Sequence, residues 1–374
     1  MNLSESEALT AEEKKLVDEI VDKMRGDIGD AAQRFDASVV RHRTKILRGR
    51  RVRNEGFQGR LYARWAVPLD LYELCLYIAQ NCGEYFNREF LPKAAATNDY
   101  QFESLVRLQA GAARVAGEIY ALLLAGFASG AHARWRTLHE IAVTALFIAQ
   151  EGKDIAERYV HHRFVKSYED ARQYQKHATK LNEKPFTDEE MRRIEKDYKA
   201  VLARYGEGFR HNYAWARPAL LRHHPELKGA KIGFEHLQAA VNIQHWTPQH
   251  RMASHAIHPS ATFLRFSLGS REEEPVILAG PSNADLAEAG QGAVLSLTKA
   301  TAALLTHVPE SRGIEYLKHQ VRLSAMATAL SVLADMASRE FVKVHHELEE
   351  EIRVEKEKGT PPNLSGRAPR PARQ

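Results

Sequence analysis

Apolar residues recur at helical spacing along most of the chain. Near the start, Thr10 and Glu13 form a capping box of the kind that opens a helix. Apolar side chains then follow at intervals of four residues, on one helical face: Leu16, Ile20, Met24 and Ile28. A second capping box, Thr187 with Glu190, opens a charged helix that extends to about residue 205.

The central part of the sequence is the most apolar. Residues 101–128 and 131–151 are rich in alanine and leucine and have little polar face, so we expect both helices to be buried. A helix over 69–91 precedes them, with Pro68 in its first turn and Pro92 at its end. Further long helices are predicted over 154–180, 286–307 and 312–355.

These elements predict an all-α protein, a multi-helix bundle, because no segment sustains the two-residue alternation of a strand. We expect an N-terminal helical extension and a disordered, basic C-terminal tail, because the tail is rich in proline and cannot build a core. The predicted organisation is an N-terminal helical region over 1–95, a core helical domain over 96–266, a loop over 267–285, long C-terminal helices over 286–356 that pack on the core, and a tail over 357–374.

The basic charge is concentrated at two places. The 374 residues include 53 basic and 48 acidic side chains, a net charge of +5 with neutral histidine. The segment 41–53 has seven basic residues and no acid, and the last fifteen residues have three arginines and no acid. Four side chains of 41–53 share a helical face and are predicted to bind RNA or another polyanion: Arg41, Lys45, Arg48 and Arg51. The alternative is a solvated, mobile loop.

The sequence argues against several classes of protein. No stretch reaches the roughly 18 apolar residues that a membrane-spanning helix needs. The N-terminus has no basic segment followed by an apolar core, so it does not resemble a secretory signal. Two cysteines, Cys75 and Cys82, cannot form a disulfide framework and fit no common zinc module. We expect a cytoplasmic protein with no membrane contact, metal or cofactor.

One short segment, 246–260, concentrates polar groups suited to chemistry. Thr247 and Pro248 predict a helix start, and Pro259 limits the helix to about three turns. Four polar side chains then fall on one face: Arg251, Ser254, His255 and His258. Histidine transfers protons near neutral pH and arginine stabilises phosphoryl charge, so this stripe predicts acid/base chemistry on a phosphate ester. The alternative is a stripe that caps the helix end by bonding to backbone.

A second polar element lies inside the most apolar helix. Arg136 and Glu140 are four residues apart and can pair. Their apolar flanks imply partial burial, where a charge requires a partner. The pair is predicted either to be structural or to support the stripe at 251–258. The chain has no Glu-x-x-His, no His-Glu-x-x-His and no phosphate-binding loop, so di-iron, zinc-protease and nucleotide-loop sites are not expected.

Several short marks, in order along residues 100–310, resemble an uncharacterised bacterial family of helical proteins. The family's own marks are an Arg-x-x-x-Glu helix and a later Ser-x-x-x-His element. In this chain the matching marks are Arg136-Thr-Leu-His-Glu140, Ala156-Glu-Arg-Tyr159 with Tyr168, Tyr213-Ala-Trp-Ala216, the run from Arg251 to Ser260, and Gly280-Pro-Ser282. The family has no established activity to transfer.

A more distant similarity is to the higher-eukaryote-and-prokaryote nucleotide-binding (HEPN) superfamily. These are helical domains, often dimeric, and many are metal-independent RNases in toxin–antitoxin and phage-defence systems. Their mark is an arginine followed after four to six residues by a histidine, which Arg251 and His258 match, although Met252 replaces the usual polar residue. The similarity implies that His258 moves a proton at the ribose 2′-hydroxyl while Arg251 holds the phosphate. Ser254 and His255 are then expected to assist.

In that hypothesis Arg136 and Glu140 orient the site, and the protein is a dimeric, RNA-handling ribonuclease of a bacterial defence or toxin-type system. The competing hypothesis is a non-catalytic helical scaffold or sensor module. There, the Arg/Glu and Ser/His elements form a structural polar network that fixes how the helices pack. The two hypotheses differ in whether these side chains reach an open surface.

Overall fold

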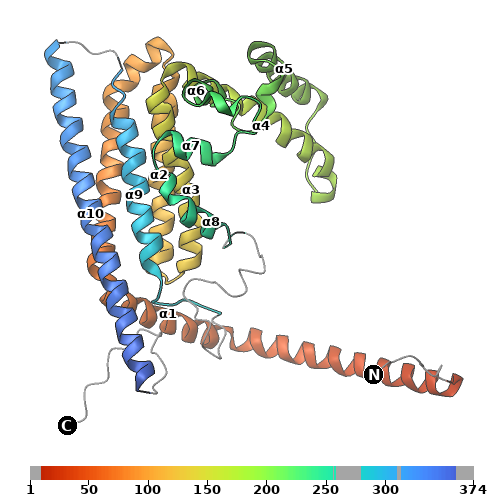
Figure 1. Cartoon of the computed structure of the whole chain (residues 1–374). Helices are drawn as coiled ribbons and strands as arrows, with labels where there is room; N and C mark the ends of the chain where they lie inside the picture. The colour runs from red at the N-terminus through yellow and green to blue at the C-terminus, as the bar shows by residue number, and fades with distance from the viewer. Residues whose placement is uncertain (1–9, 256, 258–278, 310–312, 359–374) are drawn as a thin grey trace, which may run out of the picture. The chain divides into compact units, whose positions relative to one another are not determined.

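The computed structural model describes residues 10–255, 257, 279–309 and 313–358 (Figure 1). Every regular element in these ranges is helical, so the predicted all-α class is confirmed. Among the same residues, no helix combines the length and the hydropathy that crossing a bilayer requires. The predicted tail over 357–374 lies almost wholly outside the described residues.

The chain divides into two compact units, Met1–Gly59 and Arg60–Gln374. Helix α1 (Ala11–Thr97) contributes to both, so residues 60–97 belong to the second unit. In the first unit the side chains from residue 10 to 56 are almost all exposed. Its capping box is formed as predicted, because the Thr10 amide donates to Glu13 at 2.8 Å.

The continuity of α1 corrects the prediction of a separate helix over 69–91. Pro68 and Pro92 both lie inside α1 instead of bounding it. Each proline removes one backbone donor and crowds the preceding turn, which costs about 3 kcal/mol in a helix interior. Burial of neighbouring side chains on the same helix offsets this cost, since Trp65, Leu69 and Phe90 are fully buried.

The second unit is built around a layer of long helices. Helices α2 (Tyr100–Leu124), α3 (Ala128–Glu151), α9 (Leu286–Leu305) and α10 (Gly313–Glu357) lie side by side in Figure 1. The C-terminal part of α1 joins them, since the Tyr72 hydroxyl donates to Ala116 O on α2 at 2.8 Å. Large aromatic side chains fill the core of this layer: Trp65, Tyr72, Phe86, Trp135, Phe147 and Phe341.

Small residues on α9 allow close packing within this layer. A methyl group added at Gly292 would lie 2.7 Å from Nε1 of Trp135, and one at Gly290 would lie 2.5 Å from the Phe341 ring. Both glycines therefore admit an aromatic ring from a neighbouring helix directly against the α9 backbone. The indole Nε1 of Trp135 donates to Ser296 Oγ at 3.1 Å, which anchors α3 to α9.

A second group of helices follows the C-terminal end of α3. Helix α4 (Lys153–His177) packs against α5 (Asp188–Tyr205), whose capping box of Thr187 and Glu190 is confirmed. The chain then passes through a series of short helices: η1 (Ala178–Leu181) before α5, and after it η2 (Glu207–Arg210), α6 (Arg217–His223), η3 (Pro225–Leu227), α7 (Phe234–Ala240), η4 (Gln244–Trp246) and α8 (Thr247–His255). These helices, together with α3, position the two groups of polar side chains described below.

Candidate functional site

A network of polar side chains joins α3 to α8. The Nε of Arg136 donates to Glu140 Oε1 at 2.9 Å, and His250 Nε2 donates to the same oxygen at 3.0 Å. The Nη1 of Arg136 also donates to Ser254 Oγ, and that hydroxyl donates to His250 O at 3.2 Å. The Glu140 carboxylate on α3 therefore accepts hydrogen bonds from two side chains, Arg136 on the same helix and His250 on α8.

The network is partly buried and its charges are satisfied. Only 8% of His250 is exposed, while the side chains of Arg136 and Glu140 keep 28% and 37% of their surface exposed. Burial acts to raise the pKa of Glu140, but hydrogen bonds from His250 and Arg136 outweigh it and lower that pKa below its usual value. Glu140 is therefore ionised at neutral pH and serves as the fixed anion of the network.

Aromatic rings surround the network on its inner side. The ring of His250 lies 4.8 Å from that of Phe234 and 5.8 Å from that of His139. Burial, with a smaller contribution from the charge of His250, lowers the pKa of His139 to about 4. A neutral His139 can accept a hydrogen bond, and Gln238 Nε2 donates to its Nε2 at 2.9 Å. This packing is typical of a structural core more than of an open reaction site.

The structure brings together three of the predicted site residues and separates a fourth. Arg136 and Glu140 form the pair that their spacing of four residues predicted, and Ser254 of α8 joins them in one network. Arg251 is exposed and, within the part of the chain that the structure describes, makes no hydrogen bond or ion pair with these groups. His255 is half-buried and has interactions of its own. His258, the predicted proton-transfer residue, lies outside the described residues.

The sequence pattern did not identify His250, the α8 residue that contacts Glu140. The hint in the sequence is that His250 lies three residues before Ala253 and four before Ser254, so these side chains can share a helical face, but nine residues are too few turns to mark that face as the buried one. The predicted polar face began one residue later, at Arg251. A shift of one residue rotates a helical face by about 100°, which places a different histidine on the carboxylate.

A second candidate site is a cavity of about 1020 Å³ between α4, η2 and α6 and the chain before α7. Four cationic side chains line it: Arg158, Arg210, Arg217 and Lys231. Glu169 is the one acid among its lining residues, and it is paired with Lys166 at 2.8 Å. Tyr205 and Phe209 supply aromatic walls, with ring centroids 4.6 Å apart.

Arg158 is held in place at the base of this cationic cavity. Its Nε donates to Trp215 O at 3.2 Å, and its Nη2 donates to Ala214 O at 3.3 Å. The guanidinium lies over the rings of Tyr205 and Phe209, 4.6 and 5.1 Å from their centroids. Burial lowers the pKa of Arg158, but a guanidinium remains charged in proteins.

The other cations stay accessible to a ligand. The Nη1 of Arg217 donates to Ala230 O at 3.0 Å, and so binds the backbone of the residue that precedes Lys231. Arg210 is 54% exposed, and its ion pair with Glu207 is long at 3.9 Å, so solvent screens most of that attraction. The cavity therefore presents net positive charge beside aromatic surface, which suits phosphate groups joined to planar bases.

Residues 103–275 match the model of a family of unknown function (DUF5677). The resemblance to an uncharacterised helical family is thereby confirmed for this segment, which contains both the polar network and the cationic cavity. No curated protein and no solved structure matches the chain.

Proposed function

We propose that this protein binds RNA through the cationic cavity of its family segment. The observation that carries the proposal is the clustering of Arg158, Arg210, Arg217 and Lys231 beside two aromatic rings. The volume, about 1020 Å³, is at the upper end of the roughly 300–1,000 Å³ typical of ligand sites. A nucleotide of a single strand fits this combination, since phosphates pair with the cations and a base stacks on a ring.

Phosphate contacts supply most of the affinity of such sites, and stacking favours single strands over duplexes. Arginine donates two parallel hydrogen bonds to a phosphate, and lysine acts as a point charge. The basic face of 41–53, with Arg41, Lys45, Arg48 and Arg51, is a further predicted contact for the same polyanion in the other unit.

The finer hypothesis is metal-independent cleavage of the bound RNA, with His258 as the proton-transfer group and Arg251 as the phosphate ligand. The exposure of Arg251 is consistent with a ligand contact, and in this hypothesis Arg136 and Glu140 act on α8 through their contacts with Ser254 and His250. The family match carries no activity, so this step rests on the similarity to HEPN ribonucleases.

The second candidate function, a non-catalytic scaffold, is favoured by the polar network. Its four members satisfy one another between α3 and α8, and an aromatic cluster seals their inner side. Such a network fixes the position of a helix without contacting a ligand. A non-catalytic protein that binds RNA in its cationic cavity, and in which the polar network only positions α8, is consistent with both the cavity and the network.

The proposal is tested by fluorescence anisotropy of a labelled 20-nucleotide single-stranded RNA titrated with the full chain in chelator. Reversing two accessible cations, Arg210→Glu with Lys231→Glu, is expected to weaken binding at least tenfold, because each removes a phosphate contact worth about 1 kcal/mol or more. The matched control is Lys196→Glu, an exposed cation on α5 outside the cavity, which should change affinity less than twofold.

Equal affinity of the double variant and the wild type would contradict the proposal. Displacement of the RNA by duplex DNA at equal phosphate concentration would also contradict it, because a general polyanion surface does not distinguish the two.

The same mixture, analysed on a denaturing gel, tests cleavage. Loss of RNA with wild type but not with His258→Ala would support the ribonuclease hypothesis, and intact RNA with both would reject it.

A further inference from the structure

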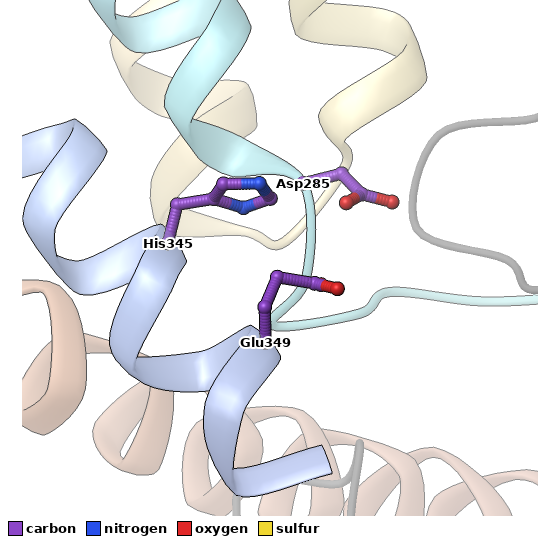
Figure 2. Close-up of side chains that lie close together, drawn as sticks. All are labelled: Asp285, His345 and Glu349. Atoms are coloured by element: carbon purple, nitrogen blue, oxygen red, sulfur yellow. The ribbon is translucent and has the colours of Figure 1, made fainter. Parts of the chain in front are cut away.

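Three side chains with metal-binding chemistry meet where α10 passes the segment that precedes α9 (Figure 2). They are Asp285, His345 and Glu349, and one ligand atom of each lies within 4.8 Å of the other two. Figure 2 shows the imidazole of His345 and the carboxylate of Glu349 extending from α10 toward Asp285. All three residues are half-buried.

The backbone around this cluster is well anchored. His345 and Glu349 are four residues apart on α10, so they lie on one face. Their neighbours Val344 and Leu348 are buried, which fixes the rotation of the helix. Asp285 takes a left-handed backbone conformation with φ of 61°, directly before the first residue of α9.

Hydrogen bonds hold the segment that carries Asp285. The indole Nε1 of Trp65 donates to Asn283 O at 3.0 Å, and Ser282 N donates to Gly126 O at 2.9 Å. Residues 282–284 are almost fully buried. The three side chains therefore project from two rigid elements, which lowers the cost of holding them around an ion.

A polar atom in the cluster lacks a partner. The Nδ1 atom of His345 is buried and makes no hydrogen bond to any described residue. Leaving a buried polar group unsatisfied costs about 1–3 kcal/mol, and such atoms in native proteins usually indicate a bound water, an ion or a ligand. The side chain of Asn283, 1% exposed and two residues before Asp285, likewise has both polar atoms unsatisfied among the described residues.

We propose that Asp285, His345 and Glu349 bind a divalent first-row transition-metal ion, Zn²⁺ or Mn²⁺, with water completing its coordination. One imidazole and two carboxylates favour such an ion over Mg²⁺ or Ca²⁺, which prefer oxygen ligands alone. Bonds of about 2.0–2.2 Å place the ligands of one ion about 3–4 Å apart, so side-chain movements of about 1 Å complete the site. The His345 Nδ1 atom then gains the partner that it lacks.

The test is calorimetric titration of full-length, chelator-treated protein with ZnCl₂, and separately with MnCl₂ and MgCl₂. We expect one equivalent of Zn²⁺ or Mn²⁺ to bind and to raise the melting temperature, because a ligand of the folded state stabilises it by mass action. His345→Ala should lose this binding by at least 100-fold, and Glu349→Gln and Asp285→Asn should weaken it at least tenfold.

The matched control is His346→Ala. His346 is the exposed neighbour of His345 on α10, so its loss should leave the tight binding unchanged. The proposal is overturned if wild type and His345→Ala bind Zn²⁺ equally, if His346→Ala weakens binding as much, or if Mg²⁺ binds as tightly as Zn²⁺. Unchanged circular dichroism of the apo variants shows that a loss of binding is not a loss of fold.

A separate observation concerns the first unit. From residue 16 to 46, α1 exposes an apolar stripe that repeats every eleven residues, as in Val17, Ile28 and Val39 and again in Met24, Phe35 and Ile46. Phe35 is 70% exposed and Ile28 is 63% exposed. An eleven-residue repeat keeps a stripe on one face of nearly straight helices, which is typical of helices that pair side by side.

The charges along this unit are divided by position. Residues 11–36 hold eight acids and five bases, whereas residues 41–53 hold seven bases and no acid. Two parallel copies would bring one basic run against the other. Two antiparallel copies bring each basic run against the acidic part of the other copy, which is favourable.

We propose that residues 11–53 pair with the same segment of a second copy of the chain, in antiparallel orientation. The four predicted RNA ligands, Arg41, Lys45, Arg48 and Arg51, lie mainly away from the stripe and remain exposed in such a pair. Burying the exposed apolar side chains of both copies supplies the driving force.

Sedimentation equilibrium of the full chain tests the pairing. Wild type is expected to be dimeric at micromolar concentration, and Ile28→Glu with Phe35→Glu should be monomeric. Ala37→Glu, on the opposite face and outside the basic run, should leave the dimer intact. The orientation is tested by short bismaleimide cross-linking of mixed single-cysteine variants. Val21→Cys should cross-link to His42→Cys but not to itself. A monomeric wild type, a dimer that survives the double variant, or Val21→Cys self-linkage would each overturn the proposal.

Discussion

His250 is the residue on which the position of α8 depends most. It is the α8 side chain that contacts the ionised Glu140 directly, and its ring packs on Phe234. Exposed Arg251, its neighbour, has neither contact. The two residues form a natural pair for testing whether the network is structural.

Replacing His250 with alanine should destabilise the fold by about 2–3 kcal/mol. The change leaves Glu140 with Arg136 as its partner and opens a cavity beside Phe234. Because 37% of the Glu140 side chain is exposed, solvent screens part of the lost interaction, and the larger values for fully buried pairs do not apply. Urea unfolding measures the effect. Arg251→Ala should change stability by less than about 0.5 kcal/mol, and an equal loss in the two variants would refute the structural role.

At the residue scale, the sequence identified three members of the network, Arg136, Glu140 and Ser254, but not the fourth, His250. Arg136 and Glu140 could be paired by spacing, and Ser254 was one of the polar side chains expected on the later short helix. The choice between His250 and Arg251 as the inward residue could not be made, because a nine-residue helix gives too few turns to define its buried face. The role of His258 stays a prediction.

At the scale of elements, most of the long helices were predictable, although α1 continues through the expected boundaries, whereas among the short helices only α8 was predicted. The helices α2, α3, α9 and α10 contain at least 20 residues each, enough turns for an apolar face to stand out. The cationic cavity combines one side of α4 with η2, α6 and the loops beside them, and these two short helices hold only four and seven residues, too few to show periodicity. Its four cations are spread from residue 158 to residue 231, so only the fold brings them together.

The packing of α9 against α3 depends on Gly292. Its substitution by alanine should destabilise the protein by about 1–3 kcal/mol, because the added methyl group would lie 2.7 Å from the buried Trp135 ring. Thermal unfolding measures the change. The control is Gly117→Ala on α2, where nothing lies within 4 Å and the better helix propensity of alanine should stabilise by up to about 1 kcal/mol. Similar shifts in both variants would contradict this view of the interface.

At the scale of the whole molecule, the chain combines two units with different surfaces. The first is an exposed helix with a basic run, and the second contains the family segment with its cavity. Net charge alone, +5, indicates neither surface, because it averages the acidic and basic segments. The location of the cations, in 41–53 and in the cavity, is what makes RNA the expected partner.

RNA binding by the cavity implies a defined dependence of the affinity on salt concentration. The logarithm of the affinity of a protein for a single strand falls with the logarithm of salt concentration, with a slope of about −0.7 for each phosphate that it neutralises. We expect Arg210→Glu with Lys231→Glu to reduce the steepness of this slope by about 1.4, in addition to weakening the binding. A double variant with the wild-type slope would show that the cavity does not contact the phosphates, and would contradict the account.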